Sequence, residues 1–340
     1  MTELKSLTYE QLQELLKQLS QPKYKADQVF SWLYRGVTSF DEMSDISKAL
    51  REKLAECSVI TVPQIERKLV SAIDGTVKYL WRLHDGEYVE SVVMKYHHGN
   101  TICVSTQVGC RMGCAFCAST KNGLVRNLTA GEICDQVIFA EKDTGERISN
   151  IVLMGIGEPL DNFDNVMTFL KNINHEKGKN IGYRHISLST CGLVDKIYEL
   201  AKIDIPITLS ISLHAPNDEK RKAIMPVARK WDVETLLKAC RDYVKVTTRR
   251  ISFEYTMIQG QNDSLDDARE LAKRLRGCLC HVNLIPVNTI AERDFTRSRK
   301  DAIEAFRSEL ERLGITATVR RTLGADINAS CGQLRNKANG

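Results

Sequence analysis

The sequence lacks any long apolar stretch, because no run of hydrophobic residues approaches the ~18 that a membrane-spanning helix needs. Its first residues, Met-Thr-Glu-Leu-Lys, lack the apolar core of a secretory signal peptide. It also contains no internal repeat and no low-complexity linker. We therefore expect a cytoplasmic protein with no membrane partner, in which the eleven cysteines are thiols and metal ligands rather than disulfides.

The composition is that of an ordinary globular protein. Of the 340 residues, 43% are hydrophobic and 27% are charged. A chain of this length buries a substantial core, and we expect one large domain with an accessory unit. The net charge of +5 is mild, so it permits nucleic-acid binding without requiring it.

Three helices are expected before residue 60. Thr8 and Gln11 form a capping-box pattern that opens a segment with helical apolar spacing, and Pro22 ends that segment. Apolar residues recur at helical spacing after Pro22, and a third short helix is expected over 47–56. Lysines and arginines give this unit a basic side, which indicates either a solvated helical face or a contact with RNA.

The periodicity then changes to that of strands. Asp74-Gly75 and Asp85-Gly86 each separate two alternating runs, which is a strong signal for antiparallel hairpins. These hairpins precede an expected first strand of the main domain at Thr101–Thr106.

After residue 106 the chain alternates between strand and helix patterns. Such alternation predicts a parallel sheet, closed or nearly closed into a barrel, although periodicity alone does not distinguish it from a doubly wound sheet. A last helix over Ser298–Leu313 and a strand over Ile315–Arg320 follow. The strands between are expected at Ile151–Met154, His185–Ser189, Ile207–Leu213, Ile251–Thr256 and Val282–Ile285.

The most informative stretch contains Cys110, Cys114 and Cys117, with glycines at 109 and 113. Thiolates are soft ligands that favour iron–sulfur clusters, zinc or Cu(I). A structural zinc site needs four ligands, and the nearest fourth candidate, Cys103, lies seven residues before Cys110. A [4Fe-4S] cluster held by only three thiolates keeps one iron open for a substrate atom. The alternatives are a zinc knuckle or three unrelated buried thiols.

The C-x3-C-x2-C spacing resembles that of the radical S-adenosyl-L-methionine (SAM) superfamily, in which the open iron chelates SAM. Further motifs extend the resemblance over nearly the whole chain, to the RlmN/Cfr family of radical-SAM methyltransferases that modify adenine in RNA. In chain order, the motifs are Gln107-Val-Gly-Cys110, Cys114-Ala-Phe-Cys117, Arg126-Asn-Leu-Thr129, Met154-Gly-Ile-Gly-Glu-Pro159, Leu188-Ser-Thr-Cys-Gly192, Ser212-Leu-His-Ala-Pro216, Asn283-Leu-Ile-Pro286 and Asp326-Ile-Asn-Ala-Ser-Cys331.

The resemblance implies an α/β fold, a partial (βα)6 TIM-like barrel of the radical-SAM type. It also implies an N-terminal helical accessory domain and a short antiparallel β extension. The expected division is a helical domain at 1–60 with a probable RNA contact, the extension at 61–100, the barrel at 101–290, and a C-terminal helix, strand and catalytic-cysteine loop at 291–340.

The resemblance also implies a reaction that uses SAM twice. Cys331 takes a methyl group from one SAM, and a second SAM on the open iron is cleaved by one electron to a 5′-deoxyadenosyl radical. That radical removes hydrogen from the methyl on Cys331, and the methylene radical adds to the adenine carbon. Glu90 then accepts the ring proton, and Cys103 attacks the sulfur of Cys331, which releases the RNA and leaves a Cys103–Cys331 disulfide. Taken singly, both cysteines are equally typical of buried structural thiols, and Glu90 of an exposed strand residue.

A set of polar residues and glycines follows the ends of the expected strands, where parallel barrels collect their functional groups. Glycines let the backbone approach a ligand closely, and Glu158 suits the cationic amino group of SAM. A lone Gly-x-Gly is usually a turn, and His214 alone would more often be a structural histidine. In the family, matching positions contact SAM. These expected SAM-binding residues are Gly157, Glu158, Ser189, Ser212, Leu213, His214 and Asn288.

The expected activity is methylation of adenine C2 in 23S rRNA (adenine-2503) and in tRNA (adenine-37), with flavodoxin or ferredoxin as electron donor. Glu158-Pro159 is typical of the C2 branch. The alternatives are Cfr-like methylation at adenine C8, which confers resistance to ribosome-targeting antibiotics, and a non-catalytic iron–sulfur or zinc protein that binds RNA. The sequence departs from the family pattern at Ile156, Ala325, Asn328 and Ser330. Basic residues expected to contact RNA are Arg111, Lys121, Arg126, Arg297, Arg299, Lys300, Arg320, Arg321, Arg335 and Lys337.

Overall fold

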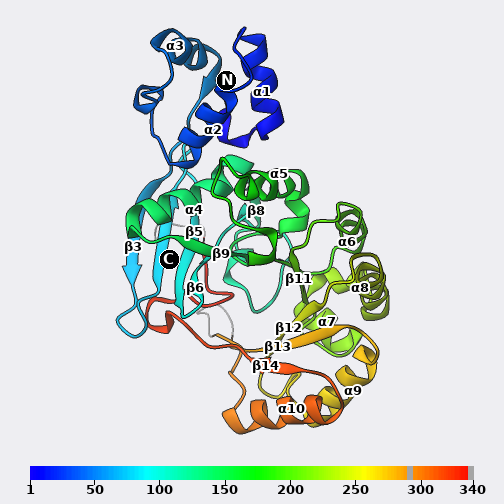
Figure 1. Ribbon diagram of the computed structural model, residues 1–340. Helices are drawn as coiled ribbons and strands as arrows, with labels where there is room; N and C mark the ends of the chain where they lie inside the picture. Colours follow the sequence, from blue (N-terminus) through cyan, green and yellow to red (C-terminus); the bar gives the residue numbers. More distant parts are fainter. Residues whose placement is uncertain (289–293, 336–340) are drawn as a thin grey trace.

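The computed structural model describes residues 1–288 and 294–335, and it is built on one ten-stranded sheet (Figure 1). The strand order is β14-β13-β12-β11-β10-β9-β6-β5-β4-β3. Neighbours from β6 to β14 are parallel, and those from β6 to β3 are antiparallel. The strands are β3 (Gln64–Val70), β4 (Val77–Arg82), β5 (Tyr88–Tyr96), β6 (Gly99–Cys103), β9 (Ile148–Leu153), β10 (Ile186–Thr190), β11 (Thr208–Ser212), β12 (Ile251–Met257), β13 (Cys280–Pro286) and β14 (Ala317–Val319).

Helices connect the parallel strands and follow the outer side of the curved sheet (Figure 1). The expected partial barrel is therefore present, and the strand expected over Ile315–Arg320 is β14, which pairs with β13 as a seventh parallel strand. None of the helices in the described ranges combines the length and apolar character needed to span a bilayer. The helices of this region are α4 (Ala130–Thr144), α5 (Phe163–Asn174), α6 (Val194–Ala201), α7 (Asp218–Ile224), α8 (Val233–Thr247), α9 (Leu265–Leu275) and α10 (Lys300–Arg312).

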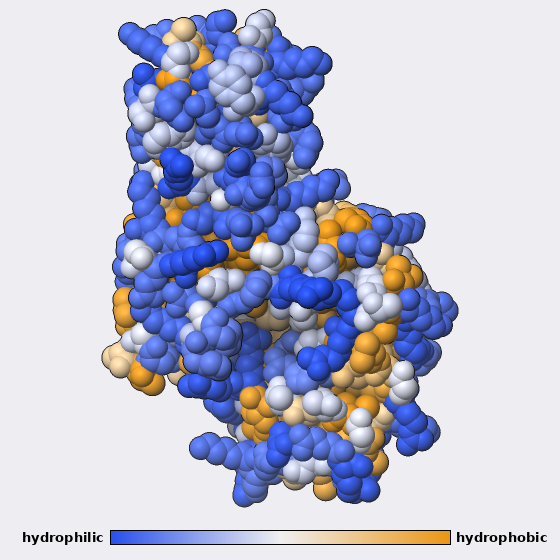
Figure 2. Space-filling model, in the orientation of Figure 1, coloured by the Kyte–Doolittle hydropathy of each residue, from blue (hydrophilic) through white to orange (hydrophobic). Residues whose placement is uncertain are grey.

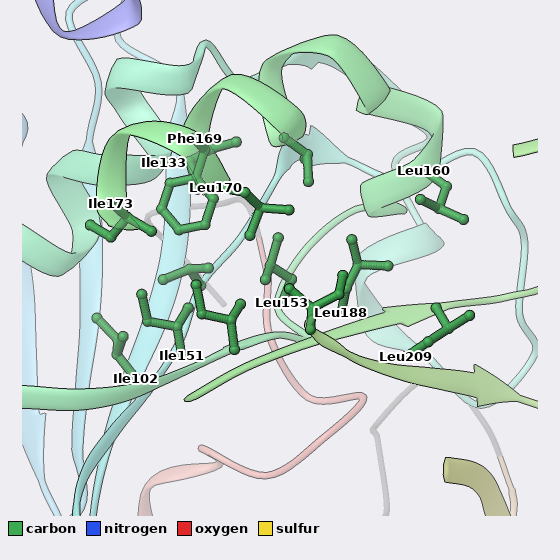
Figure 3. Close-up of a cluster of buried hydrophobic side chains, with 14 of the residues drawn as sticks. Ile102, Ile133, Ile151, Leu153, Leu160, Phe169, Leu170, Ile173, Leu188 and Leu209 are labelled. Carbon is green, nitrogen blue, oxygen red and sulfur yellow. The ribbon is translucent and has the colours of Figure 1, made fainter. Parts of the chain in front are cut away.

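The core lies between the strands and this layer of helices (Figure 3). Branched residues of the strands, such as Ile151 and Leu188, pack beneath Ile133 of α4 and Phe169 of α5. All four side chains are fully buried. Burying one such side chain contributes about 1.5–3 kcal/mol, so this layer holds the strand ends in fixed positions.

The N-terminal unit consists of three helices beyond one end of the sheet (Figure 1), as expected from the sequence. The capping box of Thr8 and Gln11 is present at the start of the first helix. Lys5 of this unit is fully buried, forms an ion pair with Asp135 of α4 and donates to the carbonyl of Thr61 (2.6 Å). Its elements are β1 (Thr2–Glu3), α1 (Tyr9–Gln18), α2 (Lys25–Tyr34), α3 (Lys48–Cys57) and β2 (Ser58–Val59), with β1 parallel to β2.

Both expected hairpins are confirmed. The turns contain Gly75 at φ +71° and Gly86 at φ +88°, a backbone conformation that glycine adopts without strain. β5 continues into β6 as an antiparallel neighbour, so the antiparallel strands extend the same sheet. The division of the chain into four domains stays a prediction, and its boundary at 290/291 lies outside the described residues.

The segment after β14 crosses back to the antiparallel strands, where Figure 1 shows it in red. Asp326 accepts hydrogen bonds from Ser71 Oγ (2.7 Å) and the Ala72 amide (2.9 Å), and the Gly324 amide donates to Asp74 (2.9 Å). These contacts with the β3–β4 turn place residues 324–335, including Cys331, across the carboxyl end of the barrel. We call residues 324–335 the C-terminal segment.

Candidate active site

A cavity of about 150 Å³ lies at the carboxyl ends of the parallel strands, as expected for a parallel barrel. We call it the main cavity. The face drawn in Figure 2 is hollowed below the N-terminal unit, with strongly hydrophilic residues along the rim of the hollow. Of the residues expected from the sequence, the cavity is bordered by Cys110, Cys114, Cys117, Gly157, Glu158, Ser189, Ser212, His214, Asn288 and Cys331.

The three cysteines of the metal-binding pattern occupy one loop beside this cavity. The loop follows a short strand, β7 (Gln107–Gly109), which pairs with β8 (Leu124–Asn127). Gly109 and Gly113 have φ of +75° and +71°, which lets the chain turn tightly between the cysteines. Burial raises the pKa of Cys110 to about 12 and raises the pKa of Cys114 and of Cys117. The metal-free thiols are therefore protonated, and metal binding would release protons.

The donor set fits an iron–sulfur cluster with one open iron. The cluster loop supplies three soft ligands to the main cavity, and the other cysteines that border it, Cys191 and Cys331, come from different loops. Within residues 1–288 and 294–335, no three His, Cys, Asp or Glu side chains meet closely enough to hold a single metal ion. The rest of the cavity wall comes largely from strand ends and mixes polar side chains, such as Ser189 and Ser212, with apolar ones, such as Leu153 and Ile285. A ligand of the open iron would lie there.

The loop after β9 approaches the cluster loop closely. Gly157 has φ +109°, and a Cβ atom there would lie 2.8 Å from the amide nitrogen of Gln107. The carboxylate of Glu158 is buried and accepts from the amides of Leu160 (3.1 Å) and Cys191 (2.7 Å). Burial raises the pKa of Glu158. Glu158 thus joins the ends of two neighbouring strands as well as bordering the cavity.

His214 is a neutral hydrogen-bond donor at the cavity wall. Its Nδ1 accepts from the amide of Thr256 (2.9 Å), so the proton of the neutral ring lies on Nε2. Burial lowers the pKa of His214 to about 3, which excludes the charged form at neutral pH. The adjacent Leu213, which was also expected to bind SAM, does not border the cavity and is fully buried in the core.

Cys331 borders two cavities. Besides the main cavity it borders a smaller one of about 40 Å³, which Cys103 of β6 also borders. Burial, and then the nearby sulfur of Cys331, raise the pKa of Cys103 to about 12. Asn288 donates from Nδ2 to the carbonyl of Cys331 (3.1 Å), which fixes the loop at the cavity wall. The structure therefore brings the two outlying cysteines together.

Glu90, the expected proton acceptor, borders neither cavity. It lies on β5 beneath the C-terminal segment, forms an ion pair with Lys78 (2.8 Å) and accepts from the amide of Arg335 (2.7 Å). Burial raises the pKa of Glu90, although Lys78 opposes this shift. Lys78 also donates to the carbonyl of Asn328 (3.1 Å), so one lysine joins the glutamate to the segment that carries Cys331.

Sequence reasoning missed some residues of the site. Arg320, expected to contact RNA, borders both cavities and lies 3.8 Å from the carboxylate of Glu254, which borders the main cavity. The available signal for Glu254 was a charged residue in the middle of strand β12, whose other residues carry no charge. Two other expected RNA contacts, Arg111 and Arg126, form ion pairs with Asp161 and Glu132. Lys337 lies outside the described residues.

Two departures from the family pattern have structural explanations. Asn328 has φ +51°, a left-handed conformation that asparagine tolerates better than most residues. Its carbonyl, rather than its side chain, binds Lys78. Ile156 is fully buried and packs against Cys103 and Leu334. Ser330 donates to the carbonyl of Leu323 (3.0 Å), and nothing in the structure explains Ala325.

Comparison with known proteins identifies the family. Residues 104–275 match the model of the radical SAM superfamily, and residues 2–60 match that of the ribosomal RNA large subunit methyltransferase N-terminal domain. A protein of Alkaliphilus oremlandii named "Probable dual-specificity RNA methyltransferase RlmN" is 57% identical over 98% of each chain. The chain belongs to the RlmN family of radical SAM RNA methyltransferases.

Other relatives agree with this placement in the RlmN family. A protein of Clostridium novyi with the same name is 55% identical over 98% of each chain. The crystal structure of a radical SAM methyltransferase from Sphaerobacter thermophilus matches with a TM-score of 0.94 and 44% identity, over 98% of this chain and 99% of that chain. The expected α/β fold of the radical SAM type and the expected enzyme class are thereby confirmed, and the superfamily implies a [4Fe-4S] cluster and SAM as cofactors.

Proposed function

We propose that this family member methylates C2 of adenine in 23S rRNA and in tRNA, with Cys331 as the methyl carrier. In this proposal each turnover uses two SAM molecules and ends in a transient disulfide between Cys331 and Cys103. The dual-specificity name of the relatives and the Glu158-Pro159 pair favour this reaction over methylation at C8.

The observation that carries the proposal is the position of Cys331 on the wall of both cavities. On one side it borders the main cavity, together with the three thiols of the cluster loop and the polar strand ends. On the other side it borders the small cavity with Cys103. A thiol that must first receive a methyl group and later be attacked by a second thiol needs both neighbours.

The cofactors would be held by residues of the main cavity. Cys110, Cys114 and Cys117 would bind the cluster, which when bound supplies the electron that cleaves SAM to a radical. The Nε2–H group of His214 and the Ser189 and Ser212 side chains would orient SAM. Arg320 lies beside Cys103, and its charge opposes the rise that burial causes in the pKa of that thiol, because an adjacent cation stabilises a thiolate.

Glu90 would accept the proton that leaves the adenine ring. Its raised pKa suits a base that must be deprotonated before it acts and protonated afterwards. Because the Arg335 amide and Lys78 cover the carboxylate, this role requires the C-terminal segment to move away from Glu90 when RNA binds. We propose a cytoplasmic location, where these RNA substrates and a donor such as flavodoxin or ferredoxin are found.

Mass spectrometry of adenosines tests the reaction. RNA is incubated with the reconstituted protein, SAM and a reductant, and then digested to nucleosides. We expect 2-methyladenosine in 23S rRNA and in tRNA. 8-Methyladenosine would instead support the C8 alternative, and an absence of both products would contradict both readings.

Substitution of the carrier tests the mechanism separately from binding. Cys331→Ala should abolish methylation and the methyl group on the protein, while RNA binding stays close to that of the parent. Cys278→Ala, which changes a cysteine outside both cavities, is the matched control and should leave methylation unchanged. Methylation by Cys331→Ala would overturn the proposal, and RNA binding without consumption of SAM by the parent would favour a non-catalytic RNA-binding protein.

A further inference from the structure

Arg221 is a buried cation behind the wall of the main cavity, and its exposed fraction is 0%. It lies on α7, and its guanidinium donates to the carbonyls of Leu213 (3.2 Å), Ser212 (3.3 Å) and Cys191 (2.7 Å). The third nitrogen, Nη1, is buried and has no hydrogen-bond partner. One donor of this side chain is therefore left unsatisfied, which is costly in a protein interior.

The positive charge of Arg221 is also unbalanced. In the described part of the chain, no carboxylate lies within ion-pair distance of it, whereas the buried lysines Lys5 and Lys78 each have a carboxylate partner. An unpaired buried charge is strongly destabilising. Its carbonyl partners and the more distant carboxylate of Asp218 reduce this cost, but within the described residues no carboxylate contacts the guanidinium.

The cluster loop is the neighbour of Arg221 that can supply an anion. The last residue of α7, Ile224, accepts a hydrogen bond from the amide of Ala115 (2.8 Å), next to Cys114. Cys114 packs in the same apolar cluster as Cys191, whose carbonyl binds Arg221. Three thiolates more than offset the positive charge of an oxidised four-iron core, so a cluster held there is an anion.

We propose that Arg221 balances the charge of the iron–sulfur cluster and makes its reduction easier. Each added electron makes the cluster more negative, and a fixed cation nearby stabilises the reduced form. The same guanidinium holds the ends of β10 and β11 at the cavity, so it links the cluster loop to the strands that would bind SAM. This inference depends on the cluster of the proposed function and is independent of the RNA substrate.

The midpoint potential of the reconstituted cluster, followed by electron paramagnetic resonance without RNA, tests the proposal. Arg221→Met and Arg221→Gln should lower the equilibrium constant for reducing the cluster at least tenfold, which is about 59 mV for a one-electron couple. Arg221→Lys keeps the charge and should restore most of the potential. Arg249→Met is the matched control, because Arg249 donates to a backbone carbonyl (Ile207, 3.1 Å) before β11 and β12 begin, at the opposite end from the cavity. It should leave the potential unchanged.

Each outcome either supports or contradicts an effect of Arg221 on the midpoint potential of the cluster. If Arg221→Met and Arg221→Gln have the same midpoint potential as Arg249→Met, then Arg221 only holds backbone carbonyls in place and does not affect the cluster. If neither neutral variant assembles a cluster, the test rests on Arg221→Lys, which keeps the charge. A tenfold drop in its equilibrium constant for reducing the cluster would contradict a role of the charge. A parent protein that binds no cluster would defeat the proposed function itself, while unchanged potentials defeat only this inference.

Discussion

At the scale of single residues, Gly157 shows how closely two loops of the cavity approach each other. A Cβ atom at this position would lie 2.8 Å from a backbone nitrogen that cannot move independently, and the φ of +109° is strained for any other residue. Gly157→Ala should therefore lower the free energy of unfolding by about 1–3 kcal/mol and weaken SAM binding. Urea unfolding and equilibrium dialysis with SAM measure the two effects.

Gly182→Ala is the matched control for Gly157. Gly182 has φ −62°, and a Cβ atom there would come no closer than 3.7 Å to another atom. Its substitution should leave SAM binding unchanged and stability equal or slightly higher, because alanine has fewer unfolded conformations to lose. Equal losses in both variants would contradict the argument from close approach.

Cys103 shares the small cavity with Cys331. If Cys103 resolves the bond between protein and RNA, then Cys103→Ala should stop after one turnover with RNA covalently attached to Cys331. Denaturing gel electrophoresis with labelled RNA should show the adduct in this variant and much less in the parent. Cys191→Ser, which changes a buried cysteine at the main cavity only, should form no excess adduct. Continued turnover by Cys103→Ala would exclude the resolving role.

At the scale of elements, Lys78 of β4 contacts both the C-terminal segment and Glu90. Lys78 lowers the pKa of the buried Glu90, so Lys78→Met should raise that pKa further. If Glu90 is the base of the proposed reaction, it acts in its deprotonated form, and the rate of methylation should rise with pH as Glu90 loses its proton. The acidic limb of the pH–rate profile should move to higher pH in Lys78→Met, and activity at neutral pH should fall.

The control for Lys78 lies on the surface of the same sheet. Lys95 of β5 forms an exposed ion pair with Glu146, and such pairs contribute little. Lys95→Met should keep the pH profile of the parent. A parallel loss of activity at every pH in Lys78→Met, with no displacement of the limb, would indicate damage to the segment rather than an effect on Glu90.

At the scale of the whole molecule, the N-terminal unit is held on the barrel by the buried pair of Lys5 and Asp135. Burial raises the pKa of Asp135 to about 7 even beside Lys5, so without the lysine this carboxyl is protonated at neutral pH and loses its hydrogen-bond partner. Lys5→Met should therefore lower the free energy of unfolding by about 1–3 kcal/mol. Lys48→Met, in an exposed pair with Glu52, should change it little. Calorimetry or urea unfolding of both variants gives the comparison, and equal small changes would show that the buried pair does not secure the unit.

Much of this architecture follows from local sequence patterns. The capping box at Thr8 and the two Asp-Gly turns specify their elements through hydrogen bonds and backbone freedom within a few residues. The motif cysteines and most of the expected strand-end residues border one cavity, because the carboxyl ends of parallel strands meet at the same edge of a sheet, while their roles stay predictions. The side chain of Leu213, which the resemblance implies as a SAM-binding residue, lies in the core, and its role in binding SAM stays a prediction.

What the sequence could not predict depends on contacts between distant segments. Lys78 and Asn328, 250 residues apart, meet only because the C-terminal segment returns to the first strands. Arg221 looks like one of several charged residues on a short helix until the fold buries it. Arg320 was expected to contact RNA, because charge alone does not reveal whether a side chain faces solvent or a cavity.

The contact between Glu90 and position 335 has a consequence for tolerance to mutation. The donor is a main-chain N–H group, and every amino acid except proline has one. As far as this contact is concerned, a saturation library at codon 335 should yield active clones with many different side chains and should be depleted of proline alone. A constraint of this kind leaves almost no trace in residue type, and the sequence pointed to position 335 only through the charge of its side chain.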